Sequence, residues 1–468
     1  MVRNRLPAES VSRFRRRGAA TIAAPVRRLL RWPGNVLHVV HLVLVVVLGG
    51  LLYALGRLGT LFIFPRARRA RAVGTLRGWL LRRAMTSLGA TFIKMGQVMS
   101  TRPDLFSPEV IAQLRRLQDR LPPFRFARVR QLVEADLGAP LGELFEHVEP
   151  RPVAAASVAQ VHRARLPGGR EVALKVLRPD VRRQVERDGK LLLLGARLLA
   201  LHPRARLSDP VGHLRHFVDA IHEQTDLRHE ADNYRRFHAN FAGWQERVTF
   251  PEVVASHSGP RVLTMEFIHG VKVDALPPGS HARVAESVRQ AMFKMCFDDG
   301  FMHADLHPGN MFVRGDDQLV IIDVGLCKEL HEDVLVQFID MSKCLSMGDP
   351  DDLVGHLRRF HVYLDGVDWE ALRRDVDAFA TRFRAQAIGE LDYGTLINEM
   401  LALGRRYHVR PVTDLTMVLV GIVTSQGIGK MLQPEVNVFA ELARYLMPVL
   451  MRRNERIPET AQARAAQA

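Results

Sequence analysis

One stretch of the sequence, residues 303–325, constrains the fold more than any other part of the chain. It reads HADLHPGNMFVRGDDQLVIIDVG, so Asn310 lies five residues after Asp305, and Asp323 lies thirteen after Asn310. An Asp, an Asn and a second Asp in this order can orient an attacking hydroxyl and hold magnesium on nucleotide phosphates. Phosphoryl transfer depends mostly on positioning and charge neutralisation, for which oxygen ligands of a hard cation suffice.

The alternative interpretation of this stretch is a polar loop followed by a hairpin strand, because Asp, Gly, Asn and Pro are common turn residues. Residues 319–322 (LVII) form a short apolar strand that ends at Asp323. A carboxylate at the end of a buried strand costs free energy unless it binds something. The pattern therefore favours a phosphate-transfer site.

Such a site needs a cation, and Lys175 is the candidate. Residues 171–176 read EVALKV after the pair Gly168–Gly169, which predicts a strand that follows a hairpin turn. This strand lysine would bind the α- and β-phosphates and pair with a glutamate on a helix. The chain has 66 basic residues, of which eight are Lys, so a lysine here indicates a need for a compact ammonium. An ordinary solvated strand lysine is the alternative.

The expected helix partner of Lys175 is Glu230. Residues 217–233, FVDAIHEQTDLRHEADN, predict a helix on which Asp226, Glu230 and Asn233 share one face. A solvated acidic face is the alternative, and Glu223 is the competing partner.

Two segments differ from a plain kinase pattern. Residues 152–161 read PVAAASVAQV, where Ala154, Ala155, Ala156 and Ser157 stand in place of a glycine-rich phosphate loop. Their backbone N–H groups can face phosphates, but a loop of alanines is stiffer than one of glycines. Upstream, residues 91–105 read TFIKMGQVMSTRPDL, with Lys94 and Gln97 at the centre. By itself this segment could be a helix followed by a turn.

Together these features resemble the ABC1/ADCK/UbiB family of atypical kinases. The similar segments are K-x-G-Q at Lys94–Gln97, the AAAS loop, EVALKV, EADN, RVLTMEFIHG at 261–270, HADLHPGN and the D-x-G at 323–325. The resemblance implies an α+β, bilobal protein-kinase-like fold with an N-terminal helical extension that covers the peptide-substrate site. It also implies ATP and Mg2+, ATPase or small-molecule phosphotransfer rather than ordinary protein kinase activity, and a link to ubiquinone or other isoprenoid-lipid metabolism.

The resemblance also assigns roles to residues. It implies that Asp305 is the catalytic-loop Asp, that Lys175 and Glu230 form the phosphate-binding pair, and that Asn310 and Asp323 bind the metal. It places the remaining residues in the nucleotide loop (Ala154, Ala155, Ala156, Ser157), at the adenine-binding hinge (Glu266) and in the gating segment (Lys94, Gln97, Asp226). Two departures stand out. Gln224 replaces the first acid of a Glu-x-Asp pair, and Val324 replaces the Phe of D-F-G.

Charge and hydropathy predict a membrane segment near the N-terminus. Residues 1–90 carry 17 Arg and one acid, Glu9, so the net charge of +16 resides there and the remainder is neutral. The run 36–56 has 21 residues without a formal charge, which is long enough to cross a bilayer core. Arg clusters on both flanks suit anionic lipids. A buried core helix and a signal peptide are the alternatives.

The composition also suggests partners and a location. We expect anionic membrane lipids as partners, and the family resemblance implies an isoprenoid or quinone lipid or lipid-biosynthesis proteins as further ones. Nucleic acid is not expected, because no aromatic residues are interleaved with the arginines. The bias of Arg over Lys favours a bacterial cytoplasmic membrane, with the mitochondrial inner membrane as the alternative. Three cysteines without CxxC spacing indicate no disulfide framework.

The expected organisation runs in chain order, and two functional alternatives stay open. The expected parts are a basic tail (1–35), a membrane segment (36–64), a helical extension (66–145), an N-lobe with a helical insertion (146–268), a C-lobe (269–455) and a disordered tail (456–468). The first alternative to an ATPase or kinase is a nucleotide-gated scaffold for lipid-biosynthesis enzymes. The second is a small-molecule phosphotransferase of the aminoglycoside or choline type, because the catalytic loops of these enzymes are similar to HADLHPGN.

Overall fold

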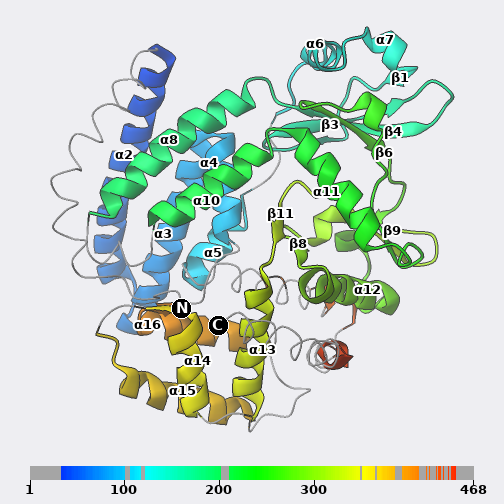
Figure 1. Ribbon diagram of the computed structural model, residues 1–468. Coiled ribbons are helices and arrows are strands. Elements are labelled where there is room, and N and C mark those ends of the chain that lie inside the picture. The colour runs from blue at the N-terminus through cyan, green and yellow to red at the C-terminus, as the bar shows by residue number, and fades with distance from the viewer. Residues whose placement is uncertain are drawn as a thin grey trace, which may run out of the picture. The chain divides into compact units, whose positions relative to one another are not determined.

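A computed structural model describes most of the chain (Figure 1). The described residues are 33–100, 106–117, 122–201, 210–347, 350–363, 366–384, 393–410 and single positions or short runs between 418 and 448. The chain divides into two compact units, Met1–Asp232 with Glu252–Phe267, and Asn233–Pro251 with Ile268–Ala468. The first 32 residues of the expected basic tail and the whole expected disordered tail lie outside the described residues.

The first unit contains a group of helices that includes the predicted extension. Helix α2 (Pro33–Ile63) runs beside α3 (Arg66–Leu88), and the two are joined by a turn at Pro65 (Figure 1). Next come α4 (Ala90–Ser100) and α5 (Pro108–Leu114), then α8 (Val181–Leu199) and α10 (Pro210–Glu223). The core of this group consists of buried apolar residues of α3, α4, α5 and the turn after α5: Met85, Leu88, Phe92, Ile93, Val110, Leu114 and Leu117.

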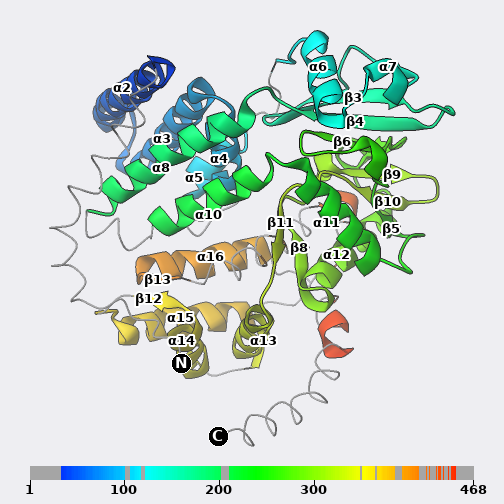
Figure 2. The same ribbon diagram turned by 45° about the horizontal axis from the view of Figure 1, so that its top comes forward.

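The first unit also contains a five-stranded antiparallel sheet. Its strand order is β1 (His147–Val148), β3 (Ala159–Arg165), β4 (Glu171–Leu177) and β6 (Val262–Glu266), with β2 (Ala154–Ala155) paired to β3. The predicted turn before residue 171 is present, because Gly168 and Gly169 have φ of 95° and 87° between β3 and β4. Helix α6 (Phe126–Leu137) covers one face of the sheet (Figure 2), and α7 (Leu141–Leu144) comes after it.

The expected single helix over 217–233 is wrong, because the chain forms two helices there. Helix α10 ends at Glu223 and α11 (Leu227–Asn240) begins after Asp226. The Asp226 carboxylate accepts a hydrogen bond from the backbone N–H of Arg228 at 3.1 Å, as residues at a helix N-terminus commonly do. Asp226 therefore does not share a helix face with Glu230 and Asn233.

The second unit combines short sheets with helices. One sheet has the order β5 (Val248–Thr249), β10 (Gln318–Ile321), β9 (Met311–Arg314) and β7 (Val271–Lys272), and β8 (Phe301–His303) pairs with β11 (Cys327–Glu329). Helix α12 (Ala282–Phe293) runs into a π-helical turn, Lys294–Asp298, just before β8. The later elements are α13 (Glu332–Met347), α14 (Pro350–Phe360), β12 (Val362–Tyr363), α15 (Trp369–Arg384), α16 (Tyr393–Arg406) and β13 (Val409–Arg410). Helices together with sheets that are antiparallel except for the β5–β10 pair confirm the predicted α+β class.

Candidate functional site

The first unit brings Lys175 and Glu230 together. Because side chains alternate along a strand, Lys175 of β4 points away from the face that its neighbours Leu174 and Val176 pack against α6. Its Nζ lies 2.7 Å from Oε1 and 2.8 Å from Oε2 of Glu230 on α11. The side chains are only 11% and 5% exposed. Glu223, the competing partner, is exposed. The pairing gives a buried ammonium held by both oxygens of one carboxylate.

The alanine-rich segment forms a tight hairpin rather than an open loop. Ala154 and Ala155 pair with Val161 and Gln160 of β3. The backbone N–H of Ala156 donates to the carbonyl of Ala159 at 2.8 Å, which closes a four-residue turn. The expectation that every residue of this segment offers its N–H to phosphates is therefore wrong for Ala156. Ser157, inside the turn, is buried.

Arg178 fixes this hairpin, although no motif in the sequence pointed to it. Its Nε donates to the carbonyl of Ala156 at 2.9 Å, and its Nη1 donates to the carbonyl of Pro122 at 3.1 Å. Its guanidinium also lies over the ring of Phe124. The side chain therefore ties the hairpin to the segment that precedes α6. The only sequence signal was an arginine directly after the strand of Lys175.

A second contact joins the same two segments. The side chain of Gln160 on β3 accepts a hydrogen bond from the backbone N–H of Phe124 at 3.0 Å. Its amide nitrogen lies 2.8 Å from Nε2 of His162, whose Nδ1 lies 2.7 Å from the carbonyl oxygen of Glu149. Burial lowers the pKa of His162. We name the contacts of Arg178 and Gln160 with residues 122–124 the hairpin clasp.

The predicted gating residues all lie in the first unit. Lys94 is buried on α4 and Gln97 is half-buried on the same helix. Gly96 lets α4 pack closely, because a Cβ there would lie 2.2 Å from Leu117 Cδ1. Asp226 binds the guanidinium of Arg228 through both carboxylate oxygens, at 2.9 and 2.5 Å, and this contact lowers the pKa of Asp226. A gating role for these residues stays a prediction.

Glu266, the expected hinge residue, ends strand β6. Its backbone N–H donates to the carbonyl of Glu252 at 2.8 Å, and it pairs with Val172 of β4. The side chain is half-buried. A contact between this backbone and adenine stays a prediction.

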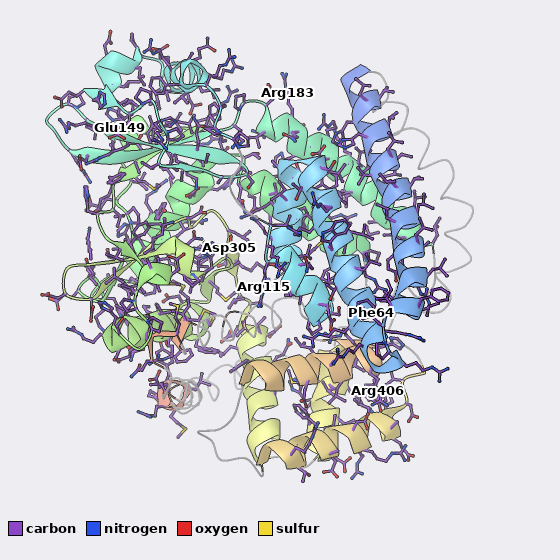
Figure 3. All side chains as sticks on the ribbon, turned by 180° about the vertical axis from the view of Figure 1, so that it is seen from behind. Phe64, Arg115, Glu149, Arg183, Asp305 and Arg406 are labelled. Carbon is purple, nitrogen blue, oxygen red and sulfur yellow. The ribbon has the colours of Figure 1, made fainter. Side chains whose placement is uncertain are left out.

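The second unit holds the loop that carries Asp305 and Asn310 (Figure 3). The backbone N–H of Asp305 donates to Nδ1 of His303 at 3.1 Å, and the amide nitrogen of Asn310 donates to the carbonyl of Asp305 at 3.2 Å. The backbone carbonyl of Asn310 accepts a hydrogen bond from the backbone N–H of Ile322 at 2.9 Å. These bonds link the loop after β8 to the end of strand β10.

His303 is a neutral positioning group. Because its Nδ1 accepts a hydrogen bond from a backbone N–H, the ring proton must be on Nε2, which lies 3.4 Å from the carbonyl oxygen of Ile322. Burial lowers the pKa of His303, although the nearby carboxylates of Asp305 and Asp323 oppose that shift. The ring therefore shapes the loop through hydrogen bonds to the backbone.

Asp323 has a strained backbone held by neighbours. Its φ is +57°, a left-handed conformation that is uncommon for residues other than glycine. Its N–H donates to the hydroxyl of Tyr234 at 2.9 Å, and the amide of Asn233 donates to the carbonyl of Val324 at 2.8 Å. Such strain persists where the surroundings enforce it, most often at functional sites. Val324 itself is fully buried, so the D-V-G segment is packed without the usual Phe.

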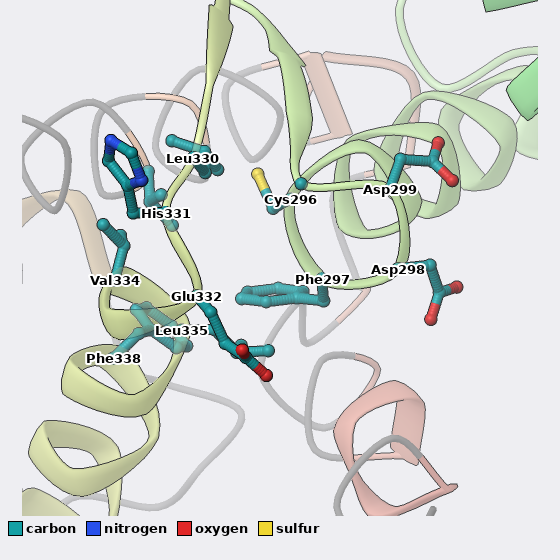
Figure 4. Close-up of a pocket in the computed structure, with 12 residues that line it drawn as sticks. Cys296, Phe297, Asp298, Asp299, Leu330, His331, Glu332, Val334, Leu335 and Phe338 are labelled. Carbon is teal, nitrogen blue, oxygen red and sulfur yellow. The ribbon is translucent and has the colours of Figure 1, made fainter. Parts of the chain in front are cut away.

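A separate cavity of about 190 Å³ opens beside the π-helical turn of the second unit (Figure 4). Cys296, Phe297 and Phe338 line it together with His331 and Glu332. Burial raises the pKa of the Cys296 thiol, so this sulfur stays protonated and unreactive. The Asp299 carboxylate at its edge binds Lys294 Nζ at 2.5 Å. The predicted site residues do not line this cavity.

Two sets of predicted residues are thus each assembled within one unit. The first unit pairs Lys175 with Glu230, and the second links Asp305, Asn310 and the start of the D-V-G segment. Convergence of the two sets around one nucleotide stays a prediction. The carbonyl oxygen of the Asn310 side chain and the carboxylate of Asp323 are hard oxygen donors of the kind that Mg2+ prefers.

This chain matches two protein-family models and is similar to several known proteins. A model described as the ABC1 atypical kinase-like domain matches residues 116–356, and one described as the UbiB helical domain matches residues 376–437. A Vibrio cholerae serotype O1 (strain M66-2) protein, named probable protein kinase UbiB, is 33% identical over 385 residues, covering 78% of this chain and 69% of that protein. The kinase-like match, the N-terminal helices and the long apolar helix agree with the predicted fold class.

Two further similarities extend the comparison. The Arabidopsis thaliana protein named ACTIVITY OF BC1 COMPLEX KINASE 7, chloroplastic, is 32% identical over 378 residues, covering 79% of this chain and 54% of that protein. A solved structure of Rv3197 with erythromycin, from Mycobacterium tuberculosis, is 22% identical and has a TM-score of 0.48. That similarity covers 73% of this chain and 91% of the other.

Proposed function

This chain belongs to the ABC1/UbiB family of atypical kinase-like proteins, and from that premise we propose that it is a membrane-associated, Mg2+- and ATP-dependent ATPase or phosphotransferase. The observation that carries the proposal is the buried pair of Lys175 and Glu230, at 2.7 Å between Nζ and Oε1. In kinases this strand-lysine and helix-glutamate pair must be in place for phosphoryl transfer.

Each residue would contribute a distinct part. Lys175 supplies a compact positive charge for the α- and β-phosphates, and Glu230 fixes the position of that charge. Asp305 orients the attacking hydroxyl or water and accepts its proton. Asn310 and Asp323 would hold magnesium, which when bound neutralises negative charge on the phosphates.

The local contacts of Asn310 and Asp323 are compatible with a magnesium site. The Asn310 amide nitrogen is occupied by the carbonyl of Asp305, which leaves the amide oxygen as the donor for a cation. Tyr234 holds the backbone of Asp323 in a strained conformation, and this fixes the position of the Cα from which the carboxylate side chain extends. Both features support a preorganised metal site.

The stiff hairpin supports slow turnover rather than ordinary protein phosphorylation. The Ala156 N–H is already bonded to Ala159, and the hairpin clasp restrains the hairpin further. We propose ATP hydrolysis or transfer to a small molecule, in support of ubiquinone or other isoprenoid-lipid metabolism at a bacterial cytoplasmic membrane. Its partners would be anionic lipids and a quinone-type lipid or the enzymes that make it.

The direct test is ATP turnover by the full chain, measured with Mg2+ and with or without anionic liposomes. We expect magnesium-dependent hydrolysis that increases on liposomes. Tight nucleotide binding without any turnover would instead indicate a nucleotide-gated scaffold. Failure to bind nucleotide at all would contradict the proposal, and lipid analysis of a deletion strain would then identify the pathway independently.

A further inference from the structure

Helix α2 has two very different faces. One face packs on α3: the His41 ring nitrogen lies 3.0 Å from the Ser87 hydroxyl, and Arg77 donates to the Tyr53 hydroxyl at 3.0 Å. Gly56 allows close contact, because a Cβ there would lie 2.5 Å from Leu76 Cδ2. Leu42 and Val45 pack against the helical core.

The opposite face of α2 is apolar and exposed along its whole length. Its large exposed side chains include Leu37, Val40, Val43, Leu44, Val46, Val47, Leu48, Leu51, Leu52, Leu55, Leu58 and Leu61. At the C-terminal end Phe62 is 89% exposed and Ile63 is 73% exposed, just before the turn marked by Phe64 in Figure 3. An apolar surface of this extent is rare in water and marks a site of contact with an apolar partner.

The charge around α2 indicates which partner this is. No acidic residue lies between Glu9 and Asp104 in the sequence, so every charged residue of the α2–α3 hairpin is basic. Its exposed arginines are Arg57, Arg66, Arg68, Arg71, Arg77 and Arg83. An apolar stripe beside the cationic α2–α3 hairpin suits a bilayer with anionic headgroups better than another protein.

The contacts of α2 argue against a helix that spans the membrane. The helix is long and apolar enough to span, over Val36–Ile63. However, α3 accompanies it from Tyr53 to His41, so a spanning α2 would carry Arg77 and its neighbours into the hydrocarbon. Near its N-terminus, His38 Nε2 lies 3.0 Å from the fully buried Asp188 of α8. Charged groups in the bilayer core are costly.

We infer that α2 lies in the plane of an anionic membrane, with its outer face immersed and its inner face held on the protein. The arginines of the hairpin then lie at the level of the lipid headgroups. This inference deepens the membrane association in the proposed function, and it does not depend on nucleotide chemistry. Both ends of α2 stay on the same side of the bilayer.

The first experiment tests that topology with the full chain in sealed vesicles of phosphatidylglycerol and phosphatidylcholine. An epitope tag precedes Met1, and protease is added from outside. We expect the protease to digest the tag of every protein molecule whose kinase-like body it digests. A tag protected in vesicles whose body is exposed would overturn the inference and establish a spanning helix.

The second experiment tests the apolar face by vesicle flotation. The triple variant Leu44→Gln, Leu51→Gln, Leu58→Gln should lose at least about tenfold in vesicle binding, because three exposed apolar side chains that enter the lipid become polar. The control variant Val271→Gln, Val336→Gln, Met447→Gln changes three exposed apolar residues of the second unit and should float normally. Equal flotation of both variants would overturn the inference.

Two further readouts complete the test. Flotation should fall by about tenfold or more on vesicles of phosphatidylcholine alone, because headgroup attraction is lost. Equal binding to both vesicle types, or a protein dimer that ignores vesicles, would contradict the anionic-membrane assignment. A magnesium-ATP thermal shift, measured on the same samples, reports the proposed function separately, so the two proposals can fail independently.

Discussion

Lys175 and Glu230 form a two-pronged ion pair, with Nζ at 2.7 and 2.8 Å from the two carboxylate oxygens. Strand β4 carries the lysine and helix α11 carries the glutamate, so the pair ties a strand to a helix 55 residues later. Both side chains are almost completely buried. Each buried charge is therefore in direct contact with an opposite charge.

Glu230→Gln should destabilise the protein and weaken its response to nucleotide. Removing one partner of a buried ion pair costs about 3–5 kcal/mol, because the remaining buried charge loses the opposite charge beside it. Urea unfolding and a magnesium-ATP thermal shift measure the two effects. The control is Glu223→Gln, which removes an exposed carboxylate from the neighbouring helix and should change neither. If the two variants behave alike, the pair has no special role.

Asp323→Asn should abolish magnesium-dependent nucleotide binding. The substitution keeps the side-chain shape but removes the negative charge that a hard cation requires. The measurement is ATP affinity with Mg2+ and with EDTA. Asp316→Asn, in the exposed turn between β9 and β10, serves as the matched control and should retain wild-type affinity. Unchanged affinity in the Asp323 variant would remove Asp323 from the metal site.

Arg178→Lys should loosen the alanine-rich hairpin while retaining the positive charge. An ammonium cannot reach the carbonyls of Ala156 and Pro122 in the way that a forked guanidinium does. Losing one net hydrogen bond, about 1 kcal/mol, should raise local amide exchange in residues 154–160 roughly fivefold. Arg183→Lys is the control, since its side chain is 88% exposed. Unaltered exchange would show that the hairpin is stable without the contacts of Arg178.

Gly96→Ala should destabilise the helical part of the first unit. The new Cβ would lie 2.2 Å from Leu117 Cδ1 and 2.5 Å from Met85 Sδ, so α4 must move. Overpacking of this kind costs about 1–3 kcal/mol. Denaturant unfolding measures the loss, with Gly195→Ala as the control because nothing lies within 4 Å of a Cβ at that helical position. Wild-type stability would mean that the core accommodates the methyl by repacking.

Acid should destabilise the second unit through its buried histidines. Burial, together with the neighbouring His356, lowers the pKa of His361 to about 3. Because the unfolded chain binds a proton near pH 6.5 and the folded chain does not, the contribution of His361 is complete above that pH. It is lost as pH falls toward 3, at up to about 1.4 kcal/mol per pH unit.

The measurement for this prediction is the unfolding free energy between pH 7.5 and 5. His361→Gln should flatten the pH dependence, because the substituted side chain cannot be protonated. His331→Gln removes an exposed histidine of the same unit and should leave the pH dependence unchanged. A profile that stays equally steep in the His361 variant would assign the acid sensitivity to other groups.

Local patterns explain why some features were predictable from the sequence. Residues close in the sequence determine the strand of Lys175, the turn at Gly168–Gly169 and the strand that ends before Asp323. The family resemblance identified Glu230 as the partner of Lys175. The spacing argument failed at Asp226, because the helix break there depends on a side-chain hydrogen bond to the Arg228 backbone.

Unlike the Lys175–Glu230 pair, some contacts between distant residues had no signal in the sequence. Arg178 reaches Pro122 across 56 residues, and Gln160 reaches Phe124 across 36. Neither contact leaves a periodic signature in the sequence. The apolar helix α2 was recognised from its composition. Which face of α2 packs on the protein depends on helix α3, which only the three-dimensional structure places beside it.

The π-helical turn at Lys294–Asp298 sets the direction in which the chain leaves helix α12. Successive residues of a helix are rotated by about 100° around its axis, and a π turn accommodates one extra residue. Deleting one residue there would regularise the helix yet swing Phe301–His303 to another side of its axis. Strand β8 would then lose its pairing with β11, so a change that makes the helix more regular would disable a loop seven residues downstream.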